Sequence, residues 1–126
     1  MKYLFVFITP ILLMLPLQGV PFSKLDVAFD QKNAETIVSY TKDKVLLNIL
    51  GKEGIYSKSQ AVLVLKDFFN GKGTTSFNYT FKSSESETDT FAIGSLQCSS
   101  AKYRITMHFK AVNSEYKIES ITIEKD

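Results

Sequence analysis

The sequence is short of the residues that most often carry chemistry. Cys98 is its single cysteine, so the chain cannot close an intramolecular disulfide and must stand on its hydrophobic core. His108 is the single histidine, and it is not near Cys98 in the sequence. Because nothing nearby activates the thiol, we expect Cys98 to be a small buried side chain on a strand. No group of residues amounts to a catalytic, cofactor or metal site, and we expect a protein that is not an enzyme.

The chain also lacks an excess of charge of one sign. Fifteen Lys and Arg residues oppose thirteen Asp and Glu residues, which gives a formal net charge of +2. Long runs of like charge are absent as well. A balance so close to zero gives no electrostatic reason to expect nucleic acid or an anionic membrane surface as a partner.

A full-length membrane span is missing too. The apolar run at positions 3–17 is shorter than the roughly 20 residues that a membrane helix needs, and two prolines interrupt it. Lys2 before the run and Gln18-Gly19 after it are instead typical of a secretory signal peptide. We therefore expect residues 1–19 to be a signal peptide that is removed near Gly19. An uncleaved anchor is the competing interpretation. The rest, 22–126, is expected to form a single exported domain with no stable membrane span.

What the sequence does contain is a clear helix at 55–70. On a period of 3.6 residues, one broad face collects six apolar side chains: Ala61, Val62, Val64, Leu65, Phe68 and Phe69. Ser57 or Ser59 can cap its start, and Gly71 stands where a helix stops. Two shorter amphipathic helices are expected before it, over 22–32 and 34–40.

The other expected elements are strands. Residues 44–50 are apolar and partly β-branched, which predicts a strand buried on both faces, and the glycines at 51 and 54 predict a turn. After Gly73 the period is two, and Phe77, Tyr79 and Phe81 form one aromatic face. A change of apolar parity near Gly94 predicts a bulge in the next strand. The strand at 103–111 alternates cleanly, and the last strand is expected to be irregular near Ser120.

The order of these elements predicts the fold class. It reads α-α-β-α-β-β-β-β, with helices segregated from a meander of strands, which is the α+β pattern. We expect N-terminal helices packed on a strongly bent antiparallel sheet, whose concave side the helices close.

The chain resembles a family of exported Bacteroidetes proteins catalogued as domain of unknown function 4783. The resemblance rests on four stretches: Ile49–Ala61, Asp67–Phe69, Phe91–Gly94 and Tyr103–Arg104. It covers essentially the whole chain. It implies the nuclear transport factor 2-like (cystatin-like) cone, in which a bent sheet wraps a long helix, and a location in the periplasm or cell envelope of a bacterium. It implies no activity.

Two surfaces are candidates for function. The first is a small-molecule pocket under the 55–70 helix, where phenol and amide groups would add polar tips to an apolar wall. Its expected lining is Tyr40, Asn48, Tyr56, Phe68, Phe69, Tyr79, Tyr103 and Met107. The second is the outer face of the sheet. There alternation places Arg104, Thr106, His108 and Lys110 beside Ser76, Asn78, Thr80 and Lys82.

The outer face is the preferred site. It is broad and, by the sequence pattern, short of large apolar residues, which suits a polar interface of modest size. His108 would point away from a pocket, which argues against a general base. We therefore expect a non-enzymatic envelope protein that binds a partner, in particular a second copy of itself as a homodimer. The pocket is the alternative, with its ligand unknown.

One acidic stretch is a weaker candidate for a functional site, a calcium-binding loop. Glu85, Glu87 and Asp89 alternate in the connection before the strand that contains Gly94. They lack the intervening Asn, Asp and Gly of a calcium-binding loop, so we interpret them as a solvated turn.

Overall fold

The computed structural model describes residues 18–85 and 89–126 of the chain. Apart from Gln18 and Gly19, the predicted signal peptide lies outside the described residues, as does Glu87. The elements are α1 (Phe22–Asp30), α2 (Ala34–Ser39), β1 (Thr41–Ile49), β2 (Lys52–Ser57), α3 (Lys58–Phe69), β3 (Ser76–Lys82), β4 (Thr90–Gln97), β5 (Lys102–Val112) and β6 (Glu115–Lys125).

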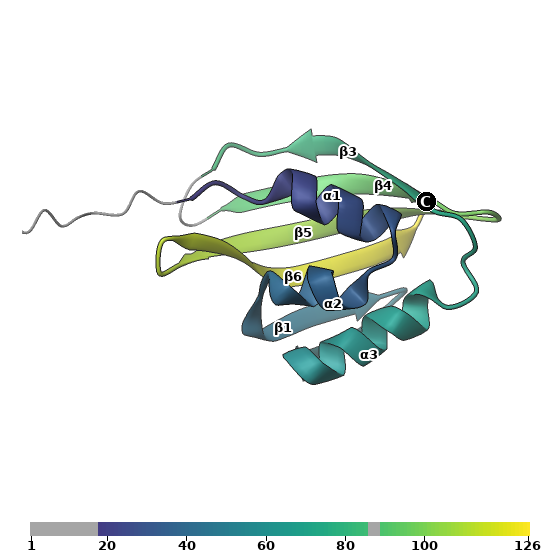
Figure 1. Cartoon of the computed structure of the whole chain (residues 1–126), viewed down its shortest axis with the longest axis horizontal. Helices are drawn as coiled ribbons and strands as arrows, with labels where there is room; N and C mark the ends of the chain where they lie inside the picture. The colour runs from purple at the N-terminus through teal and green to yellow at the C-terminus, as the bar shows by residue number, and fades with distance from the viewer. Residues whose placement is uncertain (1–17, 86–88) are drawn as a thin grey trace, which may run out of the picture.

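The strands form one sheet with the order β2-β1-β6-β5-β4-β3, and the three helices cover one of its faces (Figure 1). All neighbouring strands are antiparallel except β1 and β6, which run parallel. The sheet is therefore mixed, whereas the sequence pattern predicted antiparallel pairing throughout. The predicted α+β class and the curved sheet closed by helices are confirmed.

The core lies between the helices and the inner face of the sheet. Each helix contributes a narrow apolar stripe, as its period of 3.6 residues requires. The buried helix residues are Leu25, Ala28 and Phe29 of α1, Ala34, Ile37 and Val38 of α2, and Ala61, Leu65, Phe68 and Phe69 of α3. All the buried apolar side chains of the described residues fall between Val20 and Ile123.

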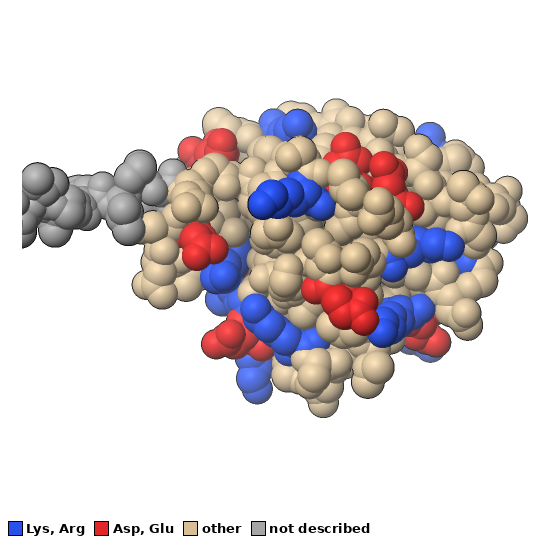
Figure 2. Space-filling model, viewed as in Figure 1, with Lys and Arg blue, Asp and Glu red and all other residues tan. Residues whose placement is uncertain are grey.

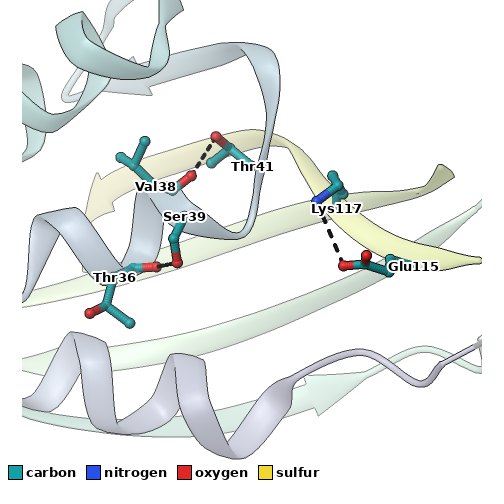
Figure 3. A network of polar contacts seen from close by, with 6 residues as sticks. All are labelled: Thr36, Val38, Ser39, Thr41, Glu115 and Lys117. Atoms are coloured by element: carbon teal, nitrogen blue, oxygen red, sulfur yellow. Dashed lines mark hydrogen bonds and ion pairs between the residues drawn. The ribbon is translucent and has the colours of Figure 1, made fainter. Parts of the chain in front are cut away.

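A buried threonine stabilises the connection between α2 and β1 (Figure 3). Thr41 is fully buried, and its hydroxyl donates a hydrogen bond of 2.8 Å to the carbonyl of Val38. The backbone N–H of Ile118 donates to the carbonyl of Tyr40 at 2.8 Å, which ties the same corner to β6. Both bonds satisfy carbonyls that the end of a short helix leaves without a partner within the helix.

Two helix and strand boundaries differ from the sequence prediction. Residues 52–57 form β2, paired with β1, so α3 begins at Lys58 and not at Ile55. Leu50 and Gly51 make the turn between β1 and β2, with φ values of 53° and 90°. Ser57 caps α3 through a capping box with Gln60, as the sequence suggested. The first three residues of the helix predicted at 55–70 therefore belong to a strand.

The predicted bulge near Gly94 is absent, because β4 alternates without interruption. Ala92, Gly94 and Leu96 face the core, while Phe91 and Ile93 lie on the outer face opposite His108 and Thr106. The sequence suggested a change of apolar face because two large apolar side chains, Phe91 and Ile93, point outward.

An irregularity occurs instead in β3. Its register shifts between Tyr79, which pairs with Gly94, and Phe81, which pairs with Ile93. Thr80 is the extra residue, so Phe81 points outward and Lys82 points inward, opposite to the sequence prediction for both. The irregularity predicted near Ser120 is confirmed, because the β5–β6 register skips Glu119.

Candidate functional site

Aromatic side chains fill the space under α3 where a pocket was predicted. Phe68, Phe69, Tyr103 and Met107 are all at most 7% exposed. The ring of Phe68 meets those of Phe69 and Tyr103 edge-on, with centroids 5.4 and 5.1 Å away. These four residues are therefore part of the core. Of the predicted lining, these residues fill space beneath the helix, and Phe68 among them also borders a hollow there.

The remaining predicted lining residues lie in three separate places. Tyr56 borders a hollow of about 280 Å³ between α3 and the β1–β2 turn, and one edge of Phe68 reaches it. Asn48 is half-buried and donates to Glu53 at 3.3 Å across the β1–β2 pair. The outward residues of β1 are not fully buried, so this strand is buried on one face only, contrary to prediction.

A hollow of about 650 Å³ brings together Tyr40 and Tyr79, the two other predicted residues. It lies at the N-terminal end of α1. Its wall consists of Gln18, Gly19, Val20, Pro21, Phe22, Ser23, Lys24, Asp26, Tyr40, Tyr79, Lys82, Glu115 and Tyr116. We call it the α1 pocket. Its volume is within the range of about 300–1,000 Å³ typical of small-molecule sites.

Tyr79 and Lys82 give the α1 pocket its polar and aromatic character. The Tyr79 hydroxyl donates to the carbonyl of Phe22 at 2.9 Å. Burial, and then the carboxylate of Asp26, raise the pKa of Tyr79 well above its ordinary value. The ammonium of Lys82 lies 4.8 Å from the ring centroid of Phe22 and 4.9 Å from that of Tyr79. Tyr79 is thus a neutral hydrogen-bond donor, and Lys82 is a cation held against two rings.

The charges around the α1 pocket are balanced. Lys24 and Lys82 are matched by Asp26 and Glu115. Figure 2 shows the same mixture of Lys, Arg, Asp and Glu over the whole helix-covered face. This arrangement does not favour a strongly charged ligand.

The outer face of the sheet carries the predicted interface residues. Arg104, His108 and Lys110 are exposed and Thr106 is half-buried. Arg104 forms an ion pair of 2.9 Å with Glu124 on the neighbouring strand. The Glu124 carboxylate also raises the pKa of Arg104. Alternation along β5 was enough to place all four side chains.

The sequence pattern did not predict the aromatic side chains that lie beside these residues. The ring of Phe91 lies 5.5 Å from His108, stacked on it, and 5.3 Å from Phe81. Ile93 follows Phe91 on the same face. We call Phe81, Phe91, Ile93 and His108 the outer-face cluster. In the sequence, the shared parity of Phe91 and Ile93 indicated part of this cluster. The bulge that brings Phe81 into it has no recognisable sequence pattern.

Reactive groups are sparse among the described residues. No cluster of three or more His, Cys, Asp or Glu side chains occurs in the described ranges. Cys98 is 4% exposed, so its predicted burial is correct, but it follows the end of β4 and is not on a strand as predicted. Burial raises the pKa of its thiol. Within residues 18–85 and 89–126, no helix has the length and apolar character to cross a membrane.

Comparison with known proteins places the chain in a family. The model of the family described as "Domain of unknown function (DUF4783)" matches residues 22–124. The chain belongs to this family. A DUF4783 protein from Bacteroides uniformis is 29% identical, with a TM-score of 0.78 over 86% of this chain and 98% of that one. Another, from Bacteroides fragilis, is 27% identical, with a TM-score of 0.76 over 86% of this chain and 100% of the other.

More distant structures show the fold. A domain of unknown function with a cystatin-like fold from Nostoc punctiforme has a TM-score of 0.67 at 8% identity, covering 83% of this chain and 72% of that one. An NTF-2 like protein of unknown function from Silicibacter pomeroyi has a TM-score of 0.62 at 7% identity, covering 83% and 89%. DUF4783 proteins thus share the predicted cone. No curated protein matches the chain.

Proposed function

We propose that this DUF4783 protein is a non-enzymatic module of the bacterial cell envelope that self-associates through the outer face of its sheet. The outer-face cluster is the observation that carries the proposal. Phe81 is 49% exposed although it could have stayed on the inner face with Phe77 and Tyr79. A bulge at Thr80 turns it outward, against Phe91. Aromatic side chains gathered on a sheet face are typical of the centre of an interface.

The size of the face suits a pair of identical subunits. Six strands about 4.8 Å apart give the width of the face, and roughly eight residues per strand at about 3.3 Å each give its length. The area of the face is therefore about 700 Å². A standard interface buries about 800 Å² per partner. If two copies face each other about a two-fold axis, the outer-face cluster of one copy can contact the same cluster of the other.

Ion pairs within each copy offset part of the positive charge on this face. Arg104 is neutralised by Glu124, and Lys42 lies 3.4 Å from Glu119. Lys110 is opposite Lys117 in the β5–β6 register, and Lys117 lies 3.7 Å from Glu115. Several cations of this face are thus paired within each copy, which lessens repulsion between two copies. The ion pairs lie on β1, β6 and β5, beside the aromatic cluster on β3, β4 and β5, so the face combines polar and apolar parts as interfaces commonly do.

Sedimentation velocity on Phe81→Lys tests the proposal. We expect the wild-type protein to dimerise and the variant to dissociate at least tenfold more readily, because the lysine places charge in the apolar centre. Leu63→Lys is the matched control, since Leu63 is 66% exposed on α3 and lies on the opposite side of the sheet. A wild-type protein that stays monomeric at millimolar concentration would rule out self-association, and an equal effect of Leu63→Lys would rule out this face.

The α1 pocket supports a second candidate function, the binding of a small amphipathic molecule. Tyr40, Tyr79 and Tyr116 supply aromatic walls with hydroxyl groups, and Lys82 supplies one cation. Anilinonaphthalene sulfonate, an aromatic probe with one negative charge, suits this wall. We expect saturable binding that Lys82→Ala weakens about tenfold and that Lys44→Ala, on β1, leaves unchanged. Unsaturable binding, or equal loss in both variants, would contradict a ligand site.

A further inference from the structure

Val20 joins the N-terminal segment to the folded domain. Its side chain is 8% exposed and belongs to the core. Its backbone N–H donates to Oε1 of Glu85 at 2.9 Å, a contact between residues 65 positions apart. Gly19 lies against the same carboxylate, since a Cβ there would be 3.2 Å from Glu85 Oε1. The Glu85 carboxylate thus lies directly beside the Gly19–Val20 peptide bond.

Among the described residues, the core begins at Val20. Before it, the backbone N–H of Gln18 donates to the carbonyl of Ser114 at 2.9 Å. Gln18 and Gly19 are exposed and have no regular secondary structure. Val20 is the first buried residue of the described chain, and α1 begins two residues later. All the core side chains of the described residues lie at or after Val20, so a chain that starts there retains this core. The Gly19–Val20 bond is therefore the boundary of the domain.

Among residues 18–85 and 89–126, the charges near this bond include the carboxylate of Glu85, for which no ion pair is seen. Lys24 and Asp26 of α1, Lys82 of β3 and Glu115 of β6 line the adjoining α1 pocket, with two positive and two negative charges. Glu85 adds a further negative charge. Among the described residues its hydrogen-bond partner is the Val20 N–H, a neutral amide. A positive charge at the Val20 nitrogen would complete the balance.

We infer that the leader is cleaved between Gly19 and Val20 and that Glu85 is the receptor of the new amino terminus. The inference rests on the export contained in the proposed function. Water adds across the peptide bond under the action of an exported peptidase. Gly19 leaves with residues 1–19 as a carboxylate, and Val20 gains a protonated amine. The neutral N–H···O bond becomes an ammonium–carboxylate pair, and hydrogen bonds between charged groups are roughly twice as strong as neutral ones.

The first test is the mass of the mature protein after expression of the full chain in a Gram-negative host. Removal of residues 1–19 from 126 leaves 107 residues, Val20–Asp126. We expect this species in the periplasmic fraction. Periplasmic protein with a different first residue would overturn the cleavage site while leaving export intact. Uncleaved protein in the cytoplasm would overturn export as well.

The second test measures whether Glu85 recognises the free amine. Glu85→Gln is placed in two chains, one that starts at Val20 and one that starts at Gln18, in which Val20 remains an amide. We expect Glu85→Gln to lower the Tm of the Val20 chain by about 4 °C more than that of the Gln18 chain. Equal effects in the two chains would overturn the role of Glu85. Glu115→Gln, a change at another pocket carboxylate, is the control and is expected to act equally in both.

The effect of Glu85→Gln on Tm should differ between the Val20 and Gln18 chains, and this difference should depend on pH. A role of Glu85 in packing alone would give no such pH dependence. An α-amine in an unfolded chain has a pKa of about 7.7–8.0. A carboxylate partner raises that pKa in the folded chain, so the stabilisation is complete at lower pH and is lost as pH rises through the folded value. We expect the difference between the two chains at pH 7 to disappear by about pH 10. A difference that persists at that pH would contradict an ammonium–carboxylate pair.

Discussion

Gly94 shows how one residue permits the packing of the aromatic core. It lies on the inner face of β4, and an added Cβ would overlap the ring of Phe77. That ring stacks on Phe29 of α1 at 4.9 Å, so it has no free space to move into. The absence of a side chain at Gly94 therefore allows α1 to approach β3.

Gly94→Ala is expected to destabilise the domain by about 2 kcal/mol, the usual cost of overfilling a packed core. For a domain of this size the Tm should fall by about 10 °C. Thermal unfolding followed by circular dichroism measures the change. Ser95→Ala, one residue along and on the outer face, should have little effect. Adding Phe77→Leu should recover part of the loss in Gly94→Ala; failure to do so would show that the clash is not with this ring.

At the scale of elements, the start of α3 depends on a single reciprocal cap. The Ser57 hydroxyl accepts from the N–H of Gln60 at 3.4 Å, and the Gln60 side chain accepts from the N–H of Ser57 at 3.1 Å. Ser57→Ala is expected to cost about 1 kcal/mol, because it leaves an amide of the first turn without a partner. Chemical denaturation measures this loss, and Lys58→Ala is the neutral control.

Adding Gln60→Ala to Ser57→Ala separates the cap from other roles of either residue. If the two side chains act as one box, the double variant should lose less than the sum of the single losses. Strictly additive losses would contradict the reciprocal cap.

Sequence periodicity predicted the helices and the alternation of β5 because local burial determines both. It could not predict features that depend on a neighbouring strand. Residues 55–57 continue the helical pattern of α3 but pair with β1, because a strand was available at that edge. The bulge at Thr80 changes the side of Phe81 and Lys82 without any glycine or proline to mark it. Both proposed sites depend on this bulge, since Phe81 belongs to one and Lys82 to the other.

At the scale of the whole molecule, the sheet separates a helix-covered side from an open side. Its inner face is closed by helices, with one hollow near the start of α1 and a smaller one between α3 and the β1–β2 turn. Its outer face is open and carries the outer-face cluster on β3, β4 and β5, towards the β3 edge of the sheet. The parallel β1–β6 pair joins the first strand to the last, so β6 lies inside the sheet. Sequence order alone gave no indication of this long-range contact.

Self-association should make the thermal stability of the molecule depend on its concentration. Dimerisation stabilises the folded state by mass action, so each tenfold rise in protein concentration adds about 1.4 kcal/mol to the dimer. We expect the Tm of the wild-type protein to rise by a few degrees over a hundredfold range in scanning calorimetry. Phe81→Lys should show a constant Tm over that range, whereas Leu63→Lys should behave as the wild type. A wild-type Tm independent of concentration would mean that the outer-face cluster does not join two copies.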